Sequence, residues 1–240
     1  MKKLTAISLA FIAAIVLLSS FKTWNERVKG SGVVKTEDRS AGKFTGIATS
    51  GIFKVELTQG NSESIKLEAE DNILPIIETR NTNGTLEIFI KKGYNIQTNK
   101  DIKVFITMAE LKRLSLSGAC KVTSTNSFKG DKLNIDQSGA SVVKLDVAMS
   151  NLMLALSGAA VVDLSGKANS MNIGASGGSH IRTTGLSTET VKIGSSGGSE
   201  IEVNAVKSLT VSSSGGSQVK YKGTPEVQQS LSGGASVSKY

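Results

Sequence analysis

The sequence predicts an all-β protein built as a parallel β-helix, a solenoid with coils of about 18–21 residues, capped by a less regular N-terminal β-layer. Three observations predict this fold: a short motif that recurs at a nearly constant spacing, alternating apolar residues on both sides of it, and few aromatic residues. Aromatic residues make up 5% of the 240 residues, against 39% for all hydrophobic types. Small aliphatic side chains must therefore fill the core, and stacked coils provide thin layers for them.

The recurring motif is a Ser-Gly pair followed by two small residues, and it occurs seven times. Its serines are Ser117, Ser138, Ser157, Ser176, Ser196, Ser214 and Ser232. Successive copies begin 21, 19, 19, 20, 18 and 18 residues apart. A regular period of this length is typical of a solenoid in which each repeat forms one coil. The glycine permits a tight bend, and the small residues beside it let neighbouring coils approach closely.

Apolar and polar residues alternate before and after each motif, as in β-strands with one buried face. Around the third copy, Leu152, Leu154 and Leu156 precede the motif, whereas Val162 and Leu164 follow it. One coil is therefore expected to hold two strands joined by the glycine bend. Coils stacked at the ~4.8 Å spacing of a β-sheet would align their apolar residues in columns inside the solenoid.

If the coils stack motif on motif, the sixth residue after each motif serine belongs to one column. This column alternates in charge and contains Lys144, Asp163, Arg182, Glu202 and Lys220. Opposite charges on adjacent strands favour this register by ~0.2–1 kcal/mol for each pair. We predict a solvent-facing ladder of charges with a structural role. The same alignment places Cys120 in a column of small residues that point inward, as a buried and unreactive thiol.

The first 20 residues resemble a secretory signal peptide. Two lysines precede an apolar run over residues 7–18, and two serines follow the run. The run is shorter than the ~20 apolar residues of a membrane-spanning helix. We therefore predict that residues 1–20 direct export and are removed; the alternative is an uncleaved N-terminal anchor. The mature chain, with no transmembrane segment, would reach the periplasm, the outer-membrane surface or the medium.

Three further segments follow the signal peptide. Residues 21–29 are polar and predict a flexible linker, residues 30–110 predict an N-terminal β region, and residues 111–240 predict the repetitive β-solenoid. Within the β region, Asn83 and Gly84 predict a type I′ hairpin turn, and Pro75 limits a helix-like pattern to a short turn. This irregular region would cap the solenoid, whose terminal coil otherwise exposes a sheet edge.

The chain also resembles a known family through motifs spread over roughly residues 30–225. The run FTGIATSGIFKVELTQG, which begins at Phe44, is similar to the opening signature of the head GIN domain, described as the head of putative auto-transporter adhesins. Gly51-Ile52-Phe53 stands where that family has a Gly-Ile-Asn-like triplet, so the asparagine is absent. Asp71-Asn72 and Gly84-Thr85-Leu86 continue the resemblance. It implies an exported bacterial protein with a β-helical fold, and it supplies no ligand-binding residues.

Several short patterns resemble catalytic motifs. Gly-x-Ser-x-Gly occurs around Ser176 and Ser196, but on successive repeats and with no helix following, whereas a hydrolase nucleophile sits on one strand-to-helix turn. His180, the only histidine, lies four residues after Ser176 and points outward by the alternation. Ser-x-x-Lys, which begins at Ser141 and at Ser217, is likewise a product of the repeat. None of these patterns predicts a nucleophile.

A β-helix can also carry a pair of catalytic carboxylates. Asp163 and Glu202 would lie two coils apart, ~9.6 Å from the strand spacing, close to the separation found in inverting glycosidases. Arg182 between them would keep both ionised, and such a pair lacks a general acid. No Cys/His cluster suits zinc, and the Gly-Gly pairs lack the spaced aspartates of calcium-binding repeats. We therefore predict no enzyme activity, no catalytic residue, no metal and no cofactor.

The formal charge of +8 decreases by two, to +6, if Lys2 and Lys3 leave with the signal peptide. This excess favours anionic glycans or lipid headgroups, or serves solubility alone. Few aromatic residues argue against nucleic acid, because they leave few stacking platforms. We predict an exported, adhesin-like, non-enzymatic binding module whose partner is a glycan or an envelope or host protein. The alternatives are a periplasmic scaffold or assembly factor, and a polysaccharide-active enzyme on the same fold.

Overall fold

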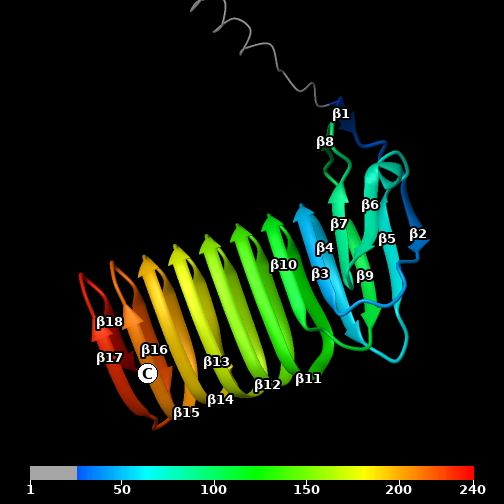
Figure 1. Cartoon of the computed structure of the whole chain (residues 1–240). Coiled ribbons are helices and arrows are strands. Elements are labelled where there is room, and N and C mark those ends of the chain that lie inside the picture. Colours follow the sequence, from blue (N-terminus) through cyan, green and yellow to red (C-terminus); the bar gives the residue numbers. More distant parts are fainter. Residues whose placement is uncertain (1–25) are drawn as a thin grey trace, which may run out of the picture.

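The computed structural model describes residues 26–240, which form an all-β solenoid and confirm the predicted fold class (Figure 1). Its repetitive part consists of long strands that each make one coil. These are β11 (Lys121–Gly139), β12 (Val142–Gly158), β13 (Val161–Gly177), β14 (His180–Gly197) and β15 (Glu200–Ser213). Each long strand pairs in parallel with the next, so the coils stack as the spacing of the motifs predicts.

Each coil contributes one segment to each of two sheets that enclose the core. In β12, buried residues alternate with more exposed ones from Val143 to Met149, and again from Leu152 to Leu156. The alternation breaks at Ser150 and Asn151, where the coil turns from one sheet to the other. In each coil, one segment precedes the Ser-Gly motif and the other follows it. The segments that precede the motif form the sheet that we call the leading sheet. The segments that follow the motif form the trailing sheet.

The strands at the two ends of the stack are shorter. The leading sheet continues through β6 (Ile77–Thr82), β7 (Thr85–Ile90), β3 (Gly46–Gly51) and β10 (Arg113–Gly118) at one end and β17 (Glu226–Leu231) at the other. The trailing sheet continues through β2 (Val34–Arg39), β5 (Ser64–Glu70), β9 (Ile102–Met108) and β4 (Phe53–Gln59), and ends with β16 (Gln218–Lys222) and β18 (Ser236–Lys239). Three pairings at the N-terminal end are antiparallel, namely β2 with β5, β5 with β9, and β6 with β7. They form the less regular layer that the sequence predicts.

The solenoid begins earlier in the chain than residue 111. Strand β3 pairs in parallel with β10, which sets Ser50 beside Ser117 and Gly51 beside Gly118. Ser50-Gly51 is therefore a further copy of the Ser-Gly pair, and strand pairing continues across the predicted boundary. Sequence analysis missed this copy because two large residues follow the glycine.

The predicted linker at residues 21–29 is wrong for its last four residues. They form β1 (Glu26–Lys29), which pairs in parallel with β8 (Tyr94–Gln97). These residues form a strand because they pair with the edge of β8, and this pairing cannot be predicted from the sequence of residues 21–29 alone. The predicted signal peptide at residues 1–20 lies outside the described residues.

The motif glycines hold the coils together at the bend. Gly158 has a φ of +88°, and a Cβ added there would lie 2.8 Å from the carbonyl oxygen of Gly139 in the preceding coil. Gly177 has the same φ, and its Cβ would lie equally close to Gly158. Only glycine accepts this backbone conformation and this approach, as the motif predicts.

Two predicted turns in the N-terminal region are confirmed. Asn83 and Gly84 have φ values of 52° and 75° between the antiparallel strands β6 and β7, as a type I′ turn requires. Pro75 lies in a single 3-10 turn, η1 (Leu74–Ile76). The turn ends there because the chain continues directly into β6.

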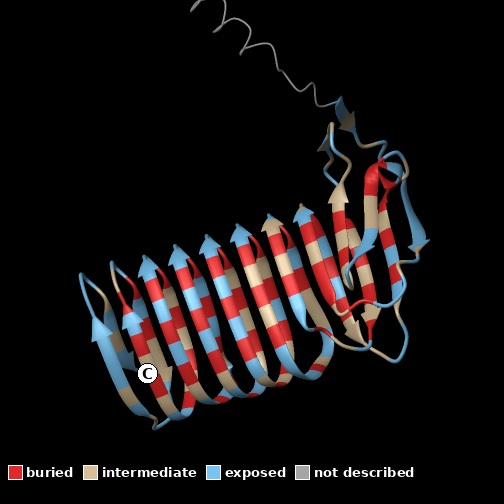
Figure 2. Cartoon of the chain, viewed as in Figure 1, coloured by how far each residue is buried: buried red, intermediate tan, exposed pale blue. Residues whose placement is uncertain are grey.

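The core is a stack of aliphatic layers, and Figure 2 shows buried and exposed residues alternating along each coil. Cys120 is buried, as predicted, with its Sγ 2.8 Å from Thr49 Oγ1. In the same column, Ser141 and Ser179 are fully buried. Their hydroxyls donate to the carbonyl oxygens of Gly118 and Gly158, at 3.2 and 3.4 Å. The column therefore adds hydrogen bonds between coils inside the apolar core.

Candidate binding surface

The residues of the possible catalytic patterns do not combine into a site. The Oγ of Ser176 donates to the carbonyl oxygen of Leu156 at 3.4 Å. His180 instead places its Nδ1 3.2 Å from Glu200 Oε2 on the next coil. No hydrogen bond joins Ser176 to His180 in the described part of the chain. A serine without a base beside it lacks the arrangement that activates a nucleophile.

The structure brings the five residues of the predicted charge ladder into one column of the trailing sheet. Each is the strand partner of the next, in the order Lys144, Asp163, Arg182, Glu202 and Lys220. Lys144 and Asp163 form an ion pair of 3.6 Å. Lys220 instead pairs at 3.3 Å with Glu200, and Arg182 has no ion pair within residues 26–240. Exposed pairs of this kind contribute about 0–1 kcal/mol each.

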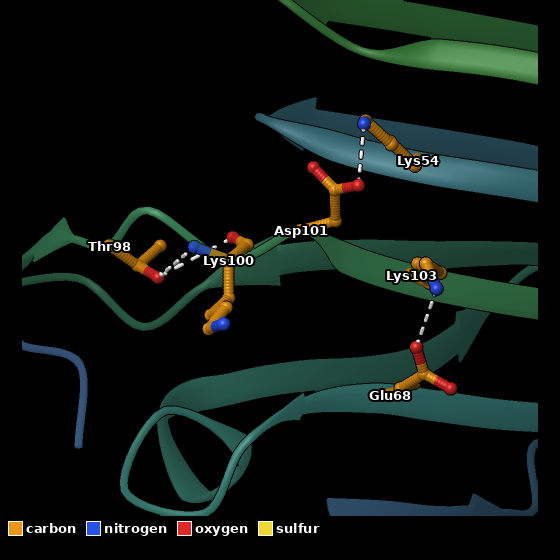
Figure 3. A network of polar contacts seen from close by, with 6 residues as sticks. All are labelled: Lys54, Glu68, Thr98, Lys100, Asp101 and Lys103. Carbon is orange, nitrogen blue, oxygen red and sulfur yellow. Dashed lines mark hydrogen bonds and ion pairs between the residues drawn. The ribbon is translucent and has the colours of Figure 1, made fainter. Parts of the chain in front are cut away.

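The outer face of the trailing sheet is charged along its N-terminal half as well (Figure 3). Lys103 lies 2.7 Å from Glu68, and Lys54 lies 2.6 Å from Asp101. The hydrogen bond from Lys54 holds the pKa of the Asp101 carboxyl below its ordinary value, and the bond to Glu68 raises the pKa of Lys103. The trailing sheet therefore carries ion pairs between neighbouring strands at both ends of the stack.

The outer face of the leading sheet is different, because small residues form one column across it. The column lies two residues before each motif serine and contains Ala48, Ser115, Asp136, Ala155, Gly174, Gly194 and Ser212. Two hollows lie over the column. One, of about 730 Å³, covers β7, β3, β10 and β11, and the other, of about 470 Å³, covers β12 to β15. Both are lined by Ala155 on β12, so the two hollows adjoin there, and we call them together the leading trough.

Two glycines in this trough are not required by the fold. Gly174 and Gly194 are exposed and lie outside the positive-φ region, unlike the motif glycines. A Cβ added at either would meet no atom closer than 3.8 or 3.9 Å. A glycine within a strand costs about 0.5–1 kcal/mol relative to alanine. These two glycines therefore lower stability and keep the trough open.

Sequence analysis missed the leading trough. Gly174 and Gly194 are the first glycines of the two Gly-x-Ser-x-Gly patterns, in which the serine is the residue expected to carry chemistry. The sequence feature that could have predicted the trough is the residue two positions before each motif serine, which is small in most coils. Reading that column requires the register of the stack.

At the described positions, residues 26–240, no three His, Cys, Asp or Glu side chains cluster in a way that could hold a metal ion. Over the same stretch, no helix has the length and apolar character needed to cross a membrane.

Comparison with known proteins gives matches over most of the chain. A protein-family model described as "Putative auto-transporter adhesin, head GIN domain" matches residues 43–225. The crystal structure of a putative adhesin from Bacteroides fragilis is similar, with 25% identity, a TM-score of 0.82, and coverage of 88% of this chain and 98% of that chain. None of the curated proteins compared with the chain is similar to it.

Two further crystal structures share the fold at lower identity. A putative adhesin from Parabacteroides merdae has 19% identity and a TM-score of 0.73, covering 90% of this chain and 99% of that chain. A putative lipid binding protein from Parabacteroides distasonis has 20% identity and a TM-score of 0.72, covering 90% of this chain and 100% of that chain.

Proposed function

Because the chain belongs to the family described as "Putative auto-transporter adhesin, head GIN domain", we propose that it is an exported binding module without catalytic activity. Its ligand lies along the leading trough. The observation that carries this proposal is the pair of glycines, Gly174 and Gly194, that the fold does not require. They lie in consecutive coils on the floor of the trough. Glycine at these positions lowers the stability of the strands, and the room that it leaves for a ligand explains its presence.

The shape of the trough favours an extended ligand. It crosses the strands, so it offers similar backbone and small side chains at every ~4.8 Å step. An extended molecule can contact several coils at once, and contacts of this kind add within one binding event. Met153 and Lys192 line the hollow over the central coils, and Phe89 lines the hollow nearer the N-terminal end.

The ionisable groups support a non-enzymatic role. Within the described residues, the carboxyl groups with shifted pKa values are Asp71, Asp101 and Glu200, and each is shifted downward. For Glu200 the main cause is the hydrogen bond from Lys220, with His180 contributing less. A general acid in glycoside hydrolysis needs a raised pKa, which is the opposite shift.

The proposal is tested by filling the trough. The double variant Gly174→Thr, Gly194→Thr places two branched side chains on its floor, where the backbone accepts them. The matched control is Gly178→Thr, Gly198→Thr, which makes the same change at the corners of the same coils, where a Cβ meets nothing within 4 Å. Labelled protein is applied to isolated envelope fragments and to an array of purified glycans.

We expect the trough variant to be at least as stable as the wild type in thermal unfolding, because threonine favours strands over glycine. The corner variant should also remain folded, because its added side chains meet no atom within 4 Å of the Cβ. The trough variant should lose about tenfold or more in affinity, the effect of ~1.4 kcal/mol, whereas the corner variant should bind like the wild type. Unchanged binding by a folded trough variant would show that the ligand binds elsewhere.

A further inference from the structure

A third hollow adjoins the leading trough, and three cationic side chains line it. It has a volume of about 400 Å³ and lies where the Asn83-Gly84 turn meets the start of β10 and the second half of β11, which belongs to the leading sheet. Lys112, Arg113 and Lys132 line it, and no carboxylate does. All three cationic residues are exposed. The hollow therefore concentrates positive charge at one end of the leading sheet.

Two of these cations are not neutralised by a neighbour. Lys112 pairs with Glu110 at 2.8 Å. Arg113 and Lys132 have no ion pair among residues 26–240. Asp131 adjoins Lys132 on β11 but does not line this hollow, and Asp136 lines the neighbouring hollow. A guanidinium and an ammonium in this arrangement suit an anionic oxygen group.

The hollow and the trough lie side by side on the same strands. Arg113 precedes Ser115 by two residues on β10, and Asn134 precedes Asp136 by two on β11. Residues two apart point to the same face of a strand, so one ligand can reach both hollows. Asn134 also holds its Oδ1 buried without a hydrogen-bond partner, an acceptor that a hydroxyl or a water molecule would satisfy.

We propose that this hollow, lined by Arg113 and Lys132, is an anion subsite of the leading trough, and that the ligand is an acidic glycan bearing carboxylate or sulfate groups. The assignment rests on the proposed function and deepens it. The anionic group pairs with the two cations, and sugar hydroxyls meet the hydroxyls and carboxylates of the adjoining hollow. Those groups belong to Ser50, Ser117, Ser138, Asp136 and Glu87.

The test compares polysaccharides that share a backbone. Affinities of the purified full chain are measured for neutral dextran and dextran sulfate of equal length, and for polygalacturonate as a carboxylated probe. The variant Arg113→Gln, Lys132→Gln removes two charges and retains hydrogen-bond donors. The control Lys121→Gln, Lys144→Gln removes two charges from the trailing sheet, on the opposite side of the core.

We expect the wild type to bind at least one acidic probe more tightly than neutral dextran. The Arg113/Lys132 variant should lose about tenfold to a hundredfold in that affinity, and the control less than about threefold, because hydrogen bonds between charged groups are stronger than those between neutral groups. Equal losses of affinity in both variants would show that binding depends only on net charge, and this result would overturn the subsite.

Two other results would also overturn the subsite while leaving the proposed function intact. In the first, filling the trough with Gly174→Thr, Gly194→Thr abolishes polysaccharide binding, but the Arg113/Lys132 variant binds as the wild type does. In the second, the Arg113/Lys132 variant loses binding to vesicles of anionic phospholipid but keeps its affinity for every polysaccharide. The cations would then recognise a lipid headgroup.

Discussion

At the scale of single residues, one buried side chain conflicts with its surroundings. Gln137 is 3% exposed, and neither its Nε2 nor its Oε1 has a hydrogen-bond partner. Its strand partners on the neighbouring coils are Leu116 and Leu156. A buried amide without partners loses its hydration and gains nothing in exchange.

Replacing this residue by leucine should therefore stabilise the protein. Gln137→Leu is expected to raise the free energy of unfolding by about 1–3 kcal/mol in urea denaturation, because it removes an unsatisfied amide and extends a leucine column. The reverse change next to it, Leu156→Gln, should lower that free energy by at least as much. A less stable Gln137→Leu protein would show that the amide holds a buried water molecule.

At the scale of the strand, the ion pairs of the trailing sheet link stability to pH. Lys54, on β4, lowers the pKa of Asp101 at the start of β9. A carboxyl whose pKa is lower in the folded state contributes stability that is complete above its unfolded pKa, near 3.8. This contribution is lost as the pH falls through the lower, folded value.

Acid unfolding should show this link. The wild type should lose stability as the pH falls below about 4. Asp101→Asn should show a smaller loss over that range, since it has no carboxyl to protonate. The comparison is made by thermal unfolding between neutral and acidic pH, with Asp131→Asn as the control at an exposed position outside any ion pair in the described chain. Parallel curves for wild type and Asp101→Asn would contradict the link.

The strand scale also shows what the sequence could predict and why the rest escaped it. The coils were predictable because each repeats a local pattern of glycine bend and alternating residues. The copy at Ser50 escaped because two large residues follow its glycine, and because β4 to β9 separate it from Ser117 and break the period. The trough and its cationic neighbour escaped because they depend on residues of several coils. Arg113 and Asn83, for example, meet only after the β6–β7 hairpin packs beside β3.

At the scale of the whole molecule, the two sheets present different outer faces. The trailing face carries ion pairs, and the leading face carries the trough with unpaired cations at one end. The stack is long and narrow, so the leading face extends along nearly all of it (Figure 1). An elongated face of this kind suits contact with an extended polymer.

Export can be measured directly. If the chain is displayed at the cell surface, protease added to intact cells should digest it, and N-terminal sequencing should show a mature start near Phe21. A periplasmic marker protein serves as the control and should resist digestion. Protection of the chain alongside that marker would contradict surface display and direct the search toward partners within the envelope.

The bulges in the coils have a consequence for how the molecule tolerates change. Coil length varies, yet the pairing of the leading sheet stays regular, because the register shifts fall at Thr123/Ser127, Asp163/Ser165, Thr183/Ser187 and Thr188/Thr190, all before the leading segment of the coil begins. The leading sheet thus keeps one constant register from coil to coil. The differences in coil length are accommodated in the other part of each coil. Insertions in that part of a coil would leave the strand register of the leading sheet unchanged. Duplication of a whole coil would lengthen the leading sheet by one strand.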